Sequence, residues 1–204
     1  MPIAMIFDAL PLESVAWLIV GYLSGSWLAA LSVCRLAGVA DPREDGSRNP
    51  GFSNVLRLYG PRLAVATLCL DALKGMPCLL LLKSLDAALW LQGAVGLAVL
   101  LGHSYPVWHR FKGGKAVASA LGVLLVLVPW VALVSAALWS LIAWRGRSAA
   151  FASLISALAA PLLCLGLAPD YAPLVALFGL LVIGRHWLNI VRLRRGEEPP
   201  LGRD

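Results

Sequence analysis

The stretch of the sequence best suited to chemistry is FKGGK, which ends in Lys112, Gly113, Gly114 and Lys115. It combines two cations with backbone that can approach an anion closely, as a phosphate-binding loop requires. The G-x-x-x-x-G-K-[ST] spacing of an ATP-binding loop is absent, and Ala116 follows the second lysine, so an ATPase is not expected. A basic anchor against anionic lipid is the simpler alternative, but such an anchor does not require paired glycines.

A second polar stretch, DGSRNPGFSNVLR at residues 45–57, also predicts an anion site. Asn49 followed by Pro50 is typical of a helix cap and a first helical position, so a helix is predicted to begin near Pro50. Ser53 and Arg57 then lie four residues apart on one helix face. The free N–H groups of a helix start, a hydroxyl and a guanidinium together suit a phosphate. An ordinary capped loop with Arg57 facing lipid phosphates is the alternative.

A third polar stretch is GRHWLNIVRLRRGEE, at residues 184–198. His186 and Asn189 lie three residues apart, and therefore on one face of a predicted helix. Arg185 and Arg192 add positive charge beside them. A histidine at a membrane boundary can also be a simple polar anchor, and this alternative stays open for His186.

Other kinds of catalytic site are not predicted. The sequence has no H-x-x-x-x-D, G-x-S-x-G or H-E-x-x-H motif, and so none of these acyltransferase, hydrolase or zinc patterns. The four cysteines lie in or beside apolar segments without a CxxC pair, and we expect them to be inert packing residues: Cys34, Cys69, Cys78 and Cys164. The polar residues are mainly cationic and hydroxylic, which suits phosphate binding and is poor for conventional triad chemistry.

The elements that position these stretches are expected to be membrane helices. Of the 204 residues, 60% are hydrophobic and 14% are charged, whereas soluble domains have roughly half and roughly a quarter. The net charge of +6 could suggest nucleic-acid binding. However, cations are expected on the cytoplasmic loops of a membrane protein, and no soluble domain is visible. We therefore predict one all-α transmembrane domain over residues 1–204 that does not bind nucleic acid.

Several apolar runs are long enough to cross a membrane, each with few or no charges: 14–34, 63–82, 87–108, 116–144, 148–169 and 171–191. As one helix the run 116–144 would measure about 43 Å, well beyond a hydrocarbon core of about 30 Å. Pro129 lies near its middle, where it would interrupt a helix. We predict a short hairpin that turns at Pro129, with arms of about 14 residues that require local membrane thinning or a partly embedded turn.

Charge supports the hairpin, because it places Lys112, Lys115 and Arg145 on one side together with most other cations. The prediction is seven transmembrane helices, with the N-terminus outside and the C-terminus cytoplasmic. The polar stretches then share the cytoplasmic side, in loops at about 35–60, 102–116 and 184–198. Inside the second span, Asp71 and Lys74 are predicted to form a structural ion pair that braces the site, with a proton relay as the alternative.

Taken together, the three stretches resemble the bacterial acyl-phosphate:glycerol-3-phosphate acyltransferases, the PlsY family of integral membrane enzymes. The motifs of that family look like GSGNPGATNVLR, GHxxPVWxxFKGGKGVAT and RHxxNIxRLxxGxE. Here they read GSRNPGFSNVLR, GHSYPVWHRFKGGKAVAS and RHWLNIVRLRRGEE, and LDALKG at residues 70–75 is similar to a family LDxLKG segment. The resemblance runs from about residue 21 to residue 198.

The resemblance implies a seven-helix enzyme of the bacterial inner membrane with a cytoplasmic active site. Its reaction would transfer a fatty acyl group from acyl phosphate to the 1-hydroxyl of glycerol 3-phosphate. The products would be 1-acyl-glycerol 3-phosphate (lysophosphatidic acid) and phosphate, in the first step of phospholipid synthesis. The family uses no metal, and we expect no cofactor, so the expected partners are the two substrates and membrane lipid.

By position in these motifs, the resemblance implies a set of catalytic residues: Ser47, Arg57, Lys115, His186 and Asn189. Arg57 and Lys115 would bind phosphate charge. Ser47 and Asn189 would orient substrate by hydrogen bonds, and His186 would help to hold the acceptor. The expected substrate-binding residues are Asn49, Gly51, Ser53, Asn54, His103, Lys112, Gly113 and Gly114. Catalysis would rest on positioning and electrostatics, with a substrate phosphate taking the proton of the glycerol hydroxyl.

The sequence departs from the family motifs at three positions. Arg48 replaces a glycine, Phe52 replaces a small alanine, and Ala116 replaces the glycine after Lys115. A glycine lost where φ must be positive costs roughly 1 kcal/mol, so we expect a less free loop at Ala116. Arg48 adds a cation beside Ser47. These changes predict an altered donor or acceptor preference within the same general reaction.

Two functions of other classes remain as alternatives. A transporter of a small phosphorylated or anionic solute would explain the cations and the charges inside the second span, but it would need polar access from both faces. A lipid-binding homologue that has lost activity would use the basic face for anionic lipid.

Overall fold

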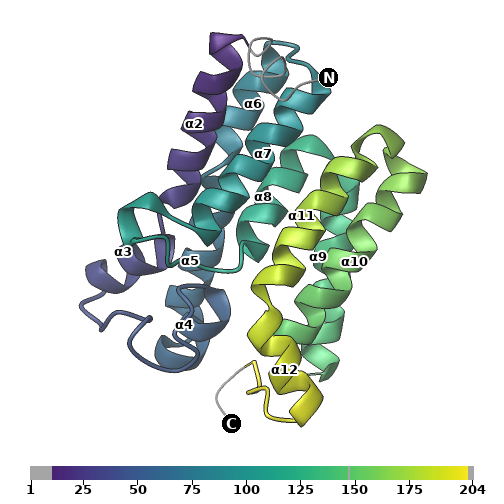
Figure 1. Cartoon of the computed structure of the whole chain (residues 1–204). Coiled ribbons are helices and arrows are strands. Elements are labelled where there is room, and N and C mark those ends of the chain that lie inside the picture. Colours follow the sequence, from purple (N-terminus) through teal and green to yellow (C-terminus); the bar gives the residue numbers. More distant parts are fainter. Residues whose placement is uncertain (1–10, 147, 202–204) are drawn as a thin grey trace.

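The computed structural model describes residues 11–146 and 148–201, and the regular elements within these ranges are all helical (Figure 1). The first half contains α2 (Leu12–Ser26), α3 (Ala29–Leu36), α4 (Phe52–Tyr59), α5 (Pro61–Leu73), α6 (Met76–Ser84) and α7 (Leu89–Ser104). The second half contains η1 (Val107–His109), α8 (Val117–Leu127), α9 (Pro129–Gly146), α10 (Ala149–Leu167), η2 (Pro169–Tyr171), α11 (Ala172–Arg185) and α12 (Trp187–Arg195). The chain's first residues, to which the prediction for the N-terminus applies, lie outside the described ranges.

Within the described ranges, three stretches are long and apolar enough to cross a membrane: Leu12–Leu36, Pro61–Ser84 and Ala149–Leu167. A fourth results if Pro169–Arg185 and Trp187–Arg195, which are bent by 59° relative to each other, count as one span. Large apolar side chains such as Trp130 and Leu180 are exposed on the outer helix faces. Such extended apolar surface is typical of contact with lipid.

Helices α2 and α7 pack at close range because glycines face the neighbouring backbone. A Cβ atom on Gly25 would lie 2.1 Å from the carbonyl oxygen of Val99, and one on Gly102 would lie 2.1 Å from the carbonyl oxygen of Tyr22. Small residues at such crossings are typical of membrane helices, which lack a hydrophobic driving force for association.

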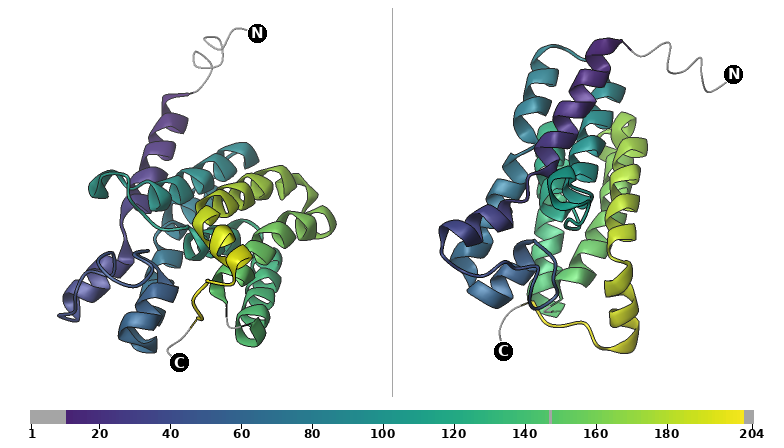
Figure 2. Two further views of the ribbon diagram at one scale, coloured as in Figure 1. Left: turned by 60° about the horizontal axis from the view of Figure 1, so that its bottom comes forward. Right: turned by 60° about the vertical axis from the view of Figure 1, so that its left-hand side comes forward.

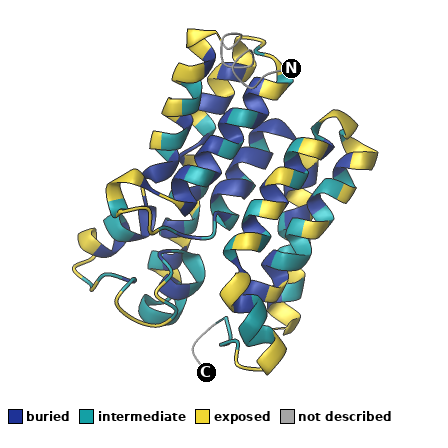
Figure 3. Cartoon of the chain, in the orientation of Figure 1, coloured by how far each residue is buried: buried dark blue, intermediate teal, exposed yellow. Residues whose placement is uncertain are grey.

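Helices α9, α10 and α11 stand side by side, apart from α2 (Figure 2). The main core lies between this group and α7 and α8, and it includes Val95, Val123, Val175 and Phe178. Buried residues follow the helix faces that are turned toward one another, and exposed residues follow the outer faces (Figure 3). The arrangement leaves α8 packed against both α5 and α9.

The chain is interrupted at Val128, between α8 and α9, so the prediction that the run 116–144 does not form one helix is confirmed. Pro129 begins α9, where its missing N–H leaves no internal hydrogen bond broken. The two arms are unequal, because α8 has 11 residues and α9 has 18. The expectation of two arms of about 14 residues is therefore wrong in detail.

Residues of the three polar stretches line one cavity. The loop before α4 and helix α12 lie near the bottom of Figure 1, and the segment that leads into α8 lies above them, near mid-height. Their convergence places the residues that the sequence singled out around one cavity.

Candidate active site

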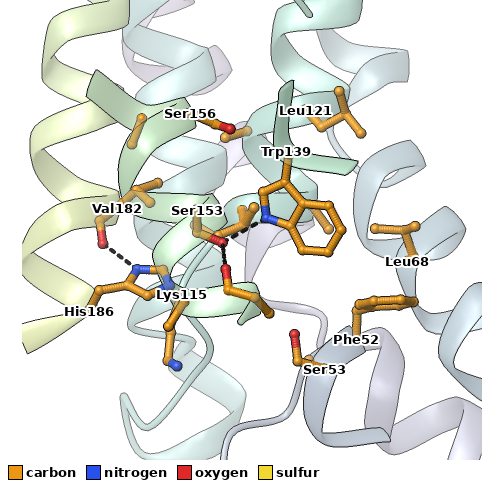
Figure 4. Close-up of a pocket in the computed structure, with 18 of the residues that line it drawn as sticks. Phe52, Ser53, Leu68, Lys115, Leu121, Trp139, Ser153, Ser156, Val182 and His186 are labelled. Carbon is orange, nitrogen blue, oxygen red and sulfur yellow. Dashed lines mark hydrogen bonds between the residues drawn. The ribbon is translucent and has the colours of Figure 1, made fainter. Parts of the chain in front are cut away.

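A cavity of about 260 Å³ lies among these stretches, between α4, α5, α8, α9, α10, α11 and α12. Most of the predicted site residues line it: Ser47, Asn49, Gly51, Ser53, Arg57, His103, Lys115, His186 and Asn189. The rest of the lining is largely apolar and includes Leu68, Leu121 and Trp139. In Figure 4, Lys115, His186 and Ser53 lie toward one end of the cavity and Leu121 toward the other. The cavity therefore suits a molecule with an anionic head and an apolar tail.

The loop that carries Ser47 is held by Asn54, which is fully buried. The Oδ1 atom of Asn54 accepts a hydrogen bond from the Ser47 backbone N–H at 2.9 Å. Its amide group donates to the carbonyl oxygens of Pro42 at 2.7 Å and Asp45 at 3.2 Å. The side chain of Asn54, which was expected to bind substrate, thus serves to fix the loop.

Helix α4 begins at Phe52 with Gly51 as its cap, so the prediction of a cap at Asn49 and a start near Pro50 is wrong by two residues. The physical reason is local. The Asn49 carbonyl accepts a hydrogen bond from the Gly51 N–H at 2.9 Å, which makes a tight turn before the helix. Ser53 and Arg57 still lie on α4 four residues apart, and both line the cavity.

Two of the departures from the family motifs occupy left-handed backbone. The φ angle is 57° at Arg48 and 60° at Ala116. Glycine populates this region freely, whereas a side chain there is strained by roughly 1–2 kcal/mol. The expectation that Ala116 stands where φ is positive is therefore confirmed, and Arg48 shares the same feature.

Gly113 and Gly114 are required by packing against His103. A Cβ atom would lie 2.1 Å from the His103 carbonyl oxygen at Gly113 and 2.2 Å from the His103 Nε2 atom at Gly114. The Gly114 N–H donates to the His103 carbonyl at 3.0 Å. Arg185 donates to the carbonyl oxygens of both glycines at 3.1 Å, so the loop is held on two sides.

The two lysines of FKGGK lie in different places. Lys115 lines the cavity, whereas Lys112 is exposed and lines a separate surface hollow together with Gly113 and Arg48. The pKa of Lys115 is lowered to about 8, first by burial and then by the positive charges of neighbouring arginines, although Glu198 opposes this shift. A lysine whose pKa is strongly shifted inside a cavity is a candidate for a functional group.

His186 presents its Nε2 atom on the cavity side (Figure 4). Its Nδ1 atom lies 2.8 Å from the carbonyl oxygen of Val182, which can only accept, so Nδ1 carries a proton. Nearby Asn189 is 3% exposed, and its Oδ1 atom has no hydrogen-bond partner within the described part of the chain. A buried acceptor of this kind is ready to accept a hydroxyl hydrogen from a ligand.

The C-terminal tail returns to the cavity through Glu198, a lining residue that sequence reasoning missed. Glu198 accepts from the Asn189 amide at 2.7 Å and from Arg192 Nε at 3.0 Å. Arg57 donates to the Pro200 carbonyl at 2.8 Å, which fastens the same segment. The sequence contained a signal for this role, because the third motif ends in RLRRGEE, with two glutamates close after a run of arginines.

Asp71 and Lys74 form the predicted ion pair, at 2.9 Å and with both side chains buried. The pair extends to His103, whose Nδ1 atom lies 2.7 Å from Lys74 Nζ. Lys74 also donates to the carbonyl oxygen of Trp27 at 2.8 Å. This cluster holds the histidine against which the glycine pair packs, which is the bracing role expected from the sequence.

Among the residues that the structure describes, no three His, Cys, Asp or Glu side chains gather in a way that could hold a metal ion. Cys34, Cys78 and Cys164 are buried and Cys69 is exposed, all as free thiols.

Comparison with known proteins gives a consistent result. Residues 15–196 match the family model described as glycerol-3-phosphate acyltransferase. The chain is 55% identical over 194 residues to the glycerol-3-phosphate acyltransferase of Chromohalobacter salexigens, covering 95% of both chains. It is 44% identical over 184 residues to the enzyme of the same name from Thioalkalivibrio sulfidiphilus, covering 89% of this chain and 90% of the other.

Solved structures agree with these sequence relatives. The fold is similar to the crystal structure of PlsY, an integral membrane glycerol 3-phosphate acyltransferase, in its glycerol 3-phosphate form. The TM-score is 0.86 at 37% identity, over 93% of this chain and 96% of that one. The lysophosphatidic acid form of PlsY gives a TM-score of 0.83 at 37% identity, over 92% and 95% of the two chains. The chain therefore belongs to the glycerol-3-phosphate acyltransferase family and is a membrane acyltransferase of the PlsY type.

Proposed function

We propose that the protein transfers a fatty acyl group from acyl phosphate to the 1-hydroxyl of glycerol 3-phosphate. The products are 1-acyl-glycerol 3-phosphate (lysophosphatidic acid) and inorganic phosphate, and the reaction is the first step of phospholipid synthesis. The observation that carries the proposal is the two-part cavity, with cations at one end and apolar helix faces along the rest. Both an acyl phosphate and the acylated product have this amphiphilic shape.

The cations of the cavity suit the two phosphates of the proposed substrates. Lys115 and Arg57 approach it from different elements, the segment before α8 and helix α4. Charge-assisted hydrogen bonds to phosphate are stronger than neutral ones, and a cavity screens them less than water does. As negative charge moves from the acyl carbonyl to the departing phosphate, fixed cations stabilise it without reorganisation.

The hydroxyl groups of the acceptor are oriented by three polar side chains of the cavity, those of Asn189, Ser47 and His186. The Oδ1 atom of Asn189, which has no partner among the described residues, accepts the hydrogen of a glycerol hydroxyl, and Ser47 supplies a hydroxyl from the loop. His186 Nε2 accepts a second hydroxyl hydrogen, because its Nδ1 proton is already directed to Val182. The proton of the attacking hydroxyl passes to a phosphate oxygen of the substrate.

We also propose seven membrane crossings within one domain, formed by α2 with α3, α5 with α6, and α7 to α11 singly. The N-terminus then lies outside and the site faces the cytoplasm of a bacterial cell at its inner membrane. The break at Val128 and the cations around the cavity support this topology. A green fluorescent protein fused after Asp204 should fluoresce, whereas a fusion in the Ser84–Leu89 turn should not, and the reverse pattern would refute the orientation.

The reaction is tested with purified protein, palmitoyl phosphate and glycerol 3-phosphate. Phosphate release should depend on the acceptor, and lysophosphatidic acid should form in equal amount. Palmitoyl-CoA in place of palmitoyl phosphate should give no product. Turnover with the CoA thioester would overturn the proposed donor. Binding of both ligands without release of phosphate would indicate a transporter or a lipid-binding homologue instead.

A further inference from the structure

Phe52 of α4 and Trp139 of α9 meet across the cavity. Their ring centroids are 6.2 Å apart, with an interplanar angle of 74°, which is an edge-to-face contact. Such contacts are favourable because the positive ring edge meets the negative ring face. Both residues line the cavity, so the contact joins two of its walls.

The Trp139 ring is fixed from behind. Its Nε1–H donates to the Ser153 hydroxyl at 2.9 Å, and that hydroxyl donates in turn to the carbonyl oxygen of Ala149 at 2.8 Å. The indole is therefore tied to α10 at its polar edge, while its ring remains against Phe52 (Figure 4). A ring held in this way resists displacement by a ligand.

The pair lies between the polar and the apolar parts of the cavity. Phe52 directly precedes Ser53 on α4, and Figure 4 places the two side by side at the polar end. Trp139 lies toward Leu121, and Leu68 lies beyond Phe52. A substrate with its phosphate at Lys115 and its chain along the apolar helices must therefore carry its first few carbons past these rings.

We propose that Phe52 and Trp139 form a constriction that selects the acyl donor by its width close to the carboxyl carbon. This rests on the proposed function. An unbranched methylene chain is narrow enough to pass the two ring edges, whereas a methyl branch on carbon 3 collides with them.

The test compares kcat/KM for hexadecanoyl phosphate and 3-methylhexadecanoyl phosphate, with glycerol 3-phosphate as the acceptor. Phe52→Ala should raise the branched-to-straight ratio by about tenfold or more, the range that one methyl group is worth in an apolar pocket. The ratio of kcat/KM for dodecanoyl phosphate to kcat/KM for hexadecanoyl phosphate should be the same in Phe52→Ala as in the unsubstituted protein. Phe52→Leu, which keeps an apolar side chain on α4, should give an intermediate branched-to-straight ratio and serves if the alanine variant does not fold.

Phe151→Ala is the matched control, because this phenylalanine is exposed on α10 and is not among the cavity residues. Its two ratios should equal those of the unsubstituted protein. An unchanged branched-to-straight ratio in active Phe52→Ala and Phe52→Leu would overturn the constriction alone. A change in the length ratio instead would show that position 52 reads length. Failure of the unsubstituted protein to use either donor would overturn the proposed function and the constriction with it.

Discussion

The side-chain amide of Asn189 donates a hydrogen bond to Glu198 over 2.7 Å, and this contact joins α12 to the C-terminal tail beside the cavity. The second carboxylate oxygen accepts from Arg192 at 3.0 Å. Glu198 therefore does two things at once. It accepts from the Asn189 amide, so that the Oδ1 atom is the Asn189 group without a partner among the described residues, and it places a negative charge among the cations that surround Lys115.

Glu198→Gln should lower kcat/KM by about tenfold, because a charge-assisted hydrogen bond is worth about 1.5–3 kcal/mol and Arg192 is partly screened by solvent. The loss of negative charge should also lower the pKa of Lys115, since Glu198 raises it in the intact protein. The alkaline limb of the pH profile should then move toward lower pH.

Glu197→Gln is the control for this effect, because Glu197 carries the same charge one residue earlier and is exposed. Steady-state rates of lysophosphatidic acid formation between about pH 6 and pH 9.5 measure both quantities. If the two variants behave alike, Glu198 contributes only general charge to the tail.

Lys115→Ala and Arg57→Ala should each lose nearly all acyl transfer from palmitoyl phosphate, because each removes a cation from the cavity. Loss of an electrostatic stabiliser of this kind reduces kcat by about 10²–10³-fold. Lys112→Ala should change kcat/KM by less than about threefold, since a surface charge contributes little. Equal losses at Lys112 and Lys115 would contradict the separation of the two lysines.

The membrane class and the gathering of the three polar stretches could be predicted from the sequence, because hydropathy and charge act along the chain. The interruption at Pro129 could be predicted because a single helix over the run 116–144 would be about 43 Å long, well beyond a hydrocarbon core of about 30 Å. The unequal arms did not follow, because the position of Val128 depends on how α8 packs against α5. A Cβ atom on Gly122 would lie 1.9 Å from the Ala72 carbonyl oxygen, and this tertiary contact has no local signal.

Individual roles within the site were harder to predict than its location. Asn54 and Ser53 are neighbours on α4, yet the Asn54 side chain hydrogen-bonds to the loop before α4, whereas Ser53 lines the cavity. Glu198 was missed because its partners, Asn189 and Arg192, come within reach only when the chain turns back after α12. The sequence indicates which residue types are present, whereas the contact that each one makes depends on the fold.

Activity should fall as pH rises through about 8, the pKa of Lys115. The shift is downward from the ordinary value of 10.5, so the lysine loses its proton and its charge within the working range. Below about 8 the buried cation destabilises the empty protein, and this cost disappears as pH rises toward 10.5. KM for the phosphate-bearing substrates should therefore increase above pH 8 while the protein itself becomes slightly more stable.

Lys115→Arg provides the check on this assignment, because a guanidinium keeps its charge throughout the range. Its kcat/KM, although lower, should remain flat where that of the unsubstituted protein declines. If kcat/KM declines with the same midpoint in both proteins, the alkaline limb of the pH profile arises from another group.

Ala116→Gly should raise the free energy of unfolding by about 1 kcal/mol, because alanine at φ 60° is strained and glycine is not. Arg48→Gly, at φ 57°, should act in the same direction. Ala137→Gly, at an exposed position inside α9, is the matched control, and there the same change should destabilise by roughly 0.5–1 kcal/mol. Thermal unfolding in one detergent measures the stability of all three variants relative to the unsubstituted protein. If the glycine variants at positions 116 and 48 are more stable and the variant at 137 is less stable, the strain lies in the two loops that border the cavity. If all three variants are less stable, the left-handed positions carry no strain.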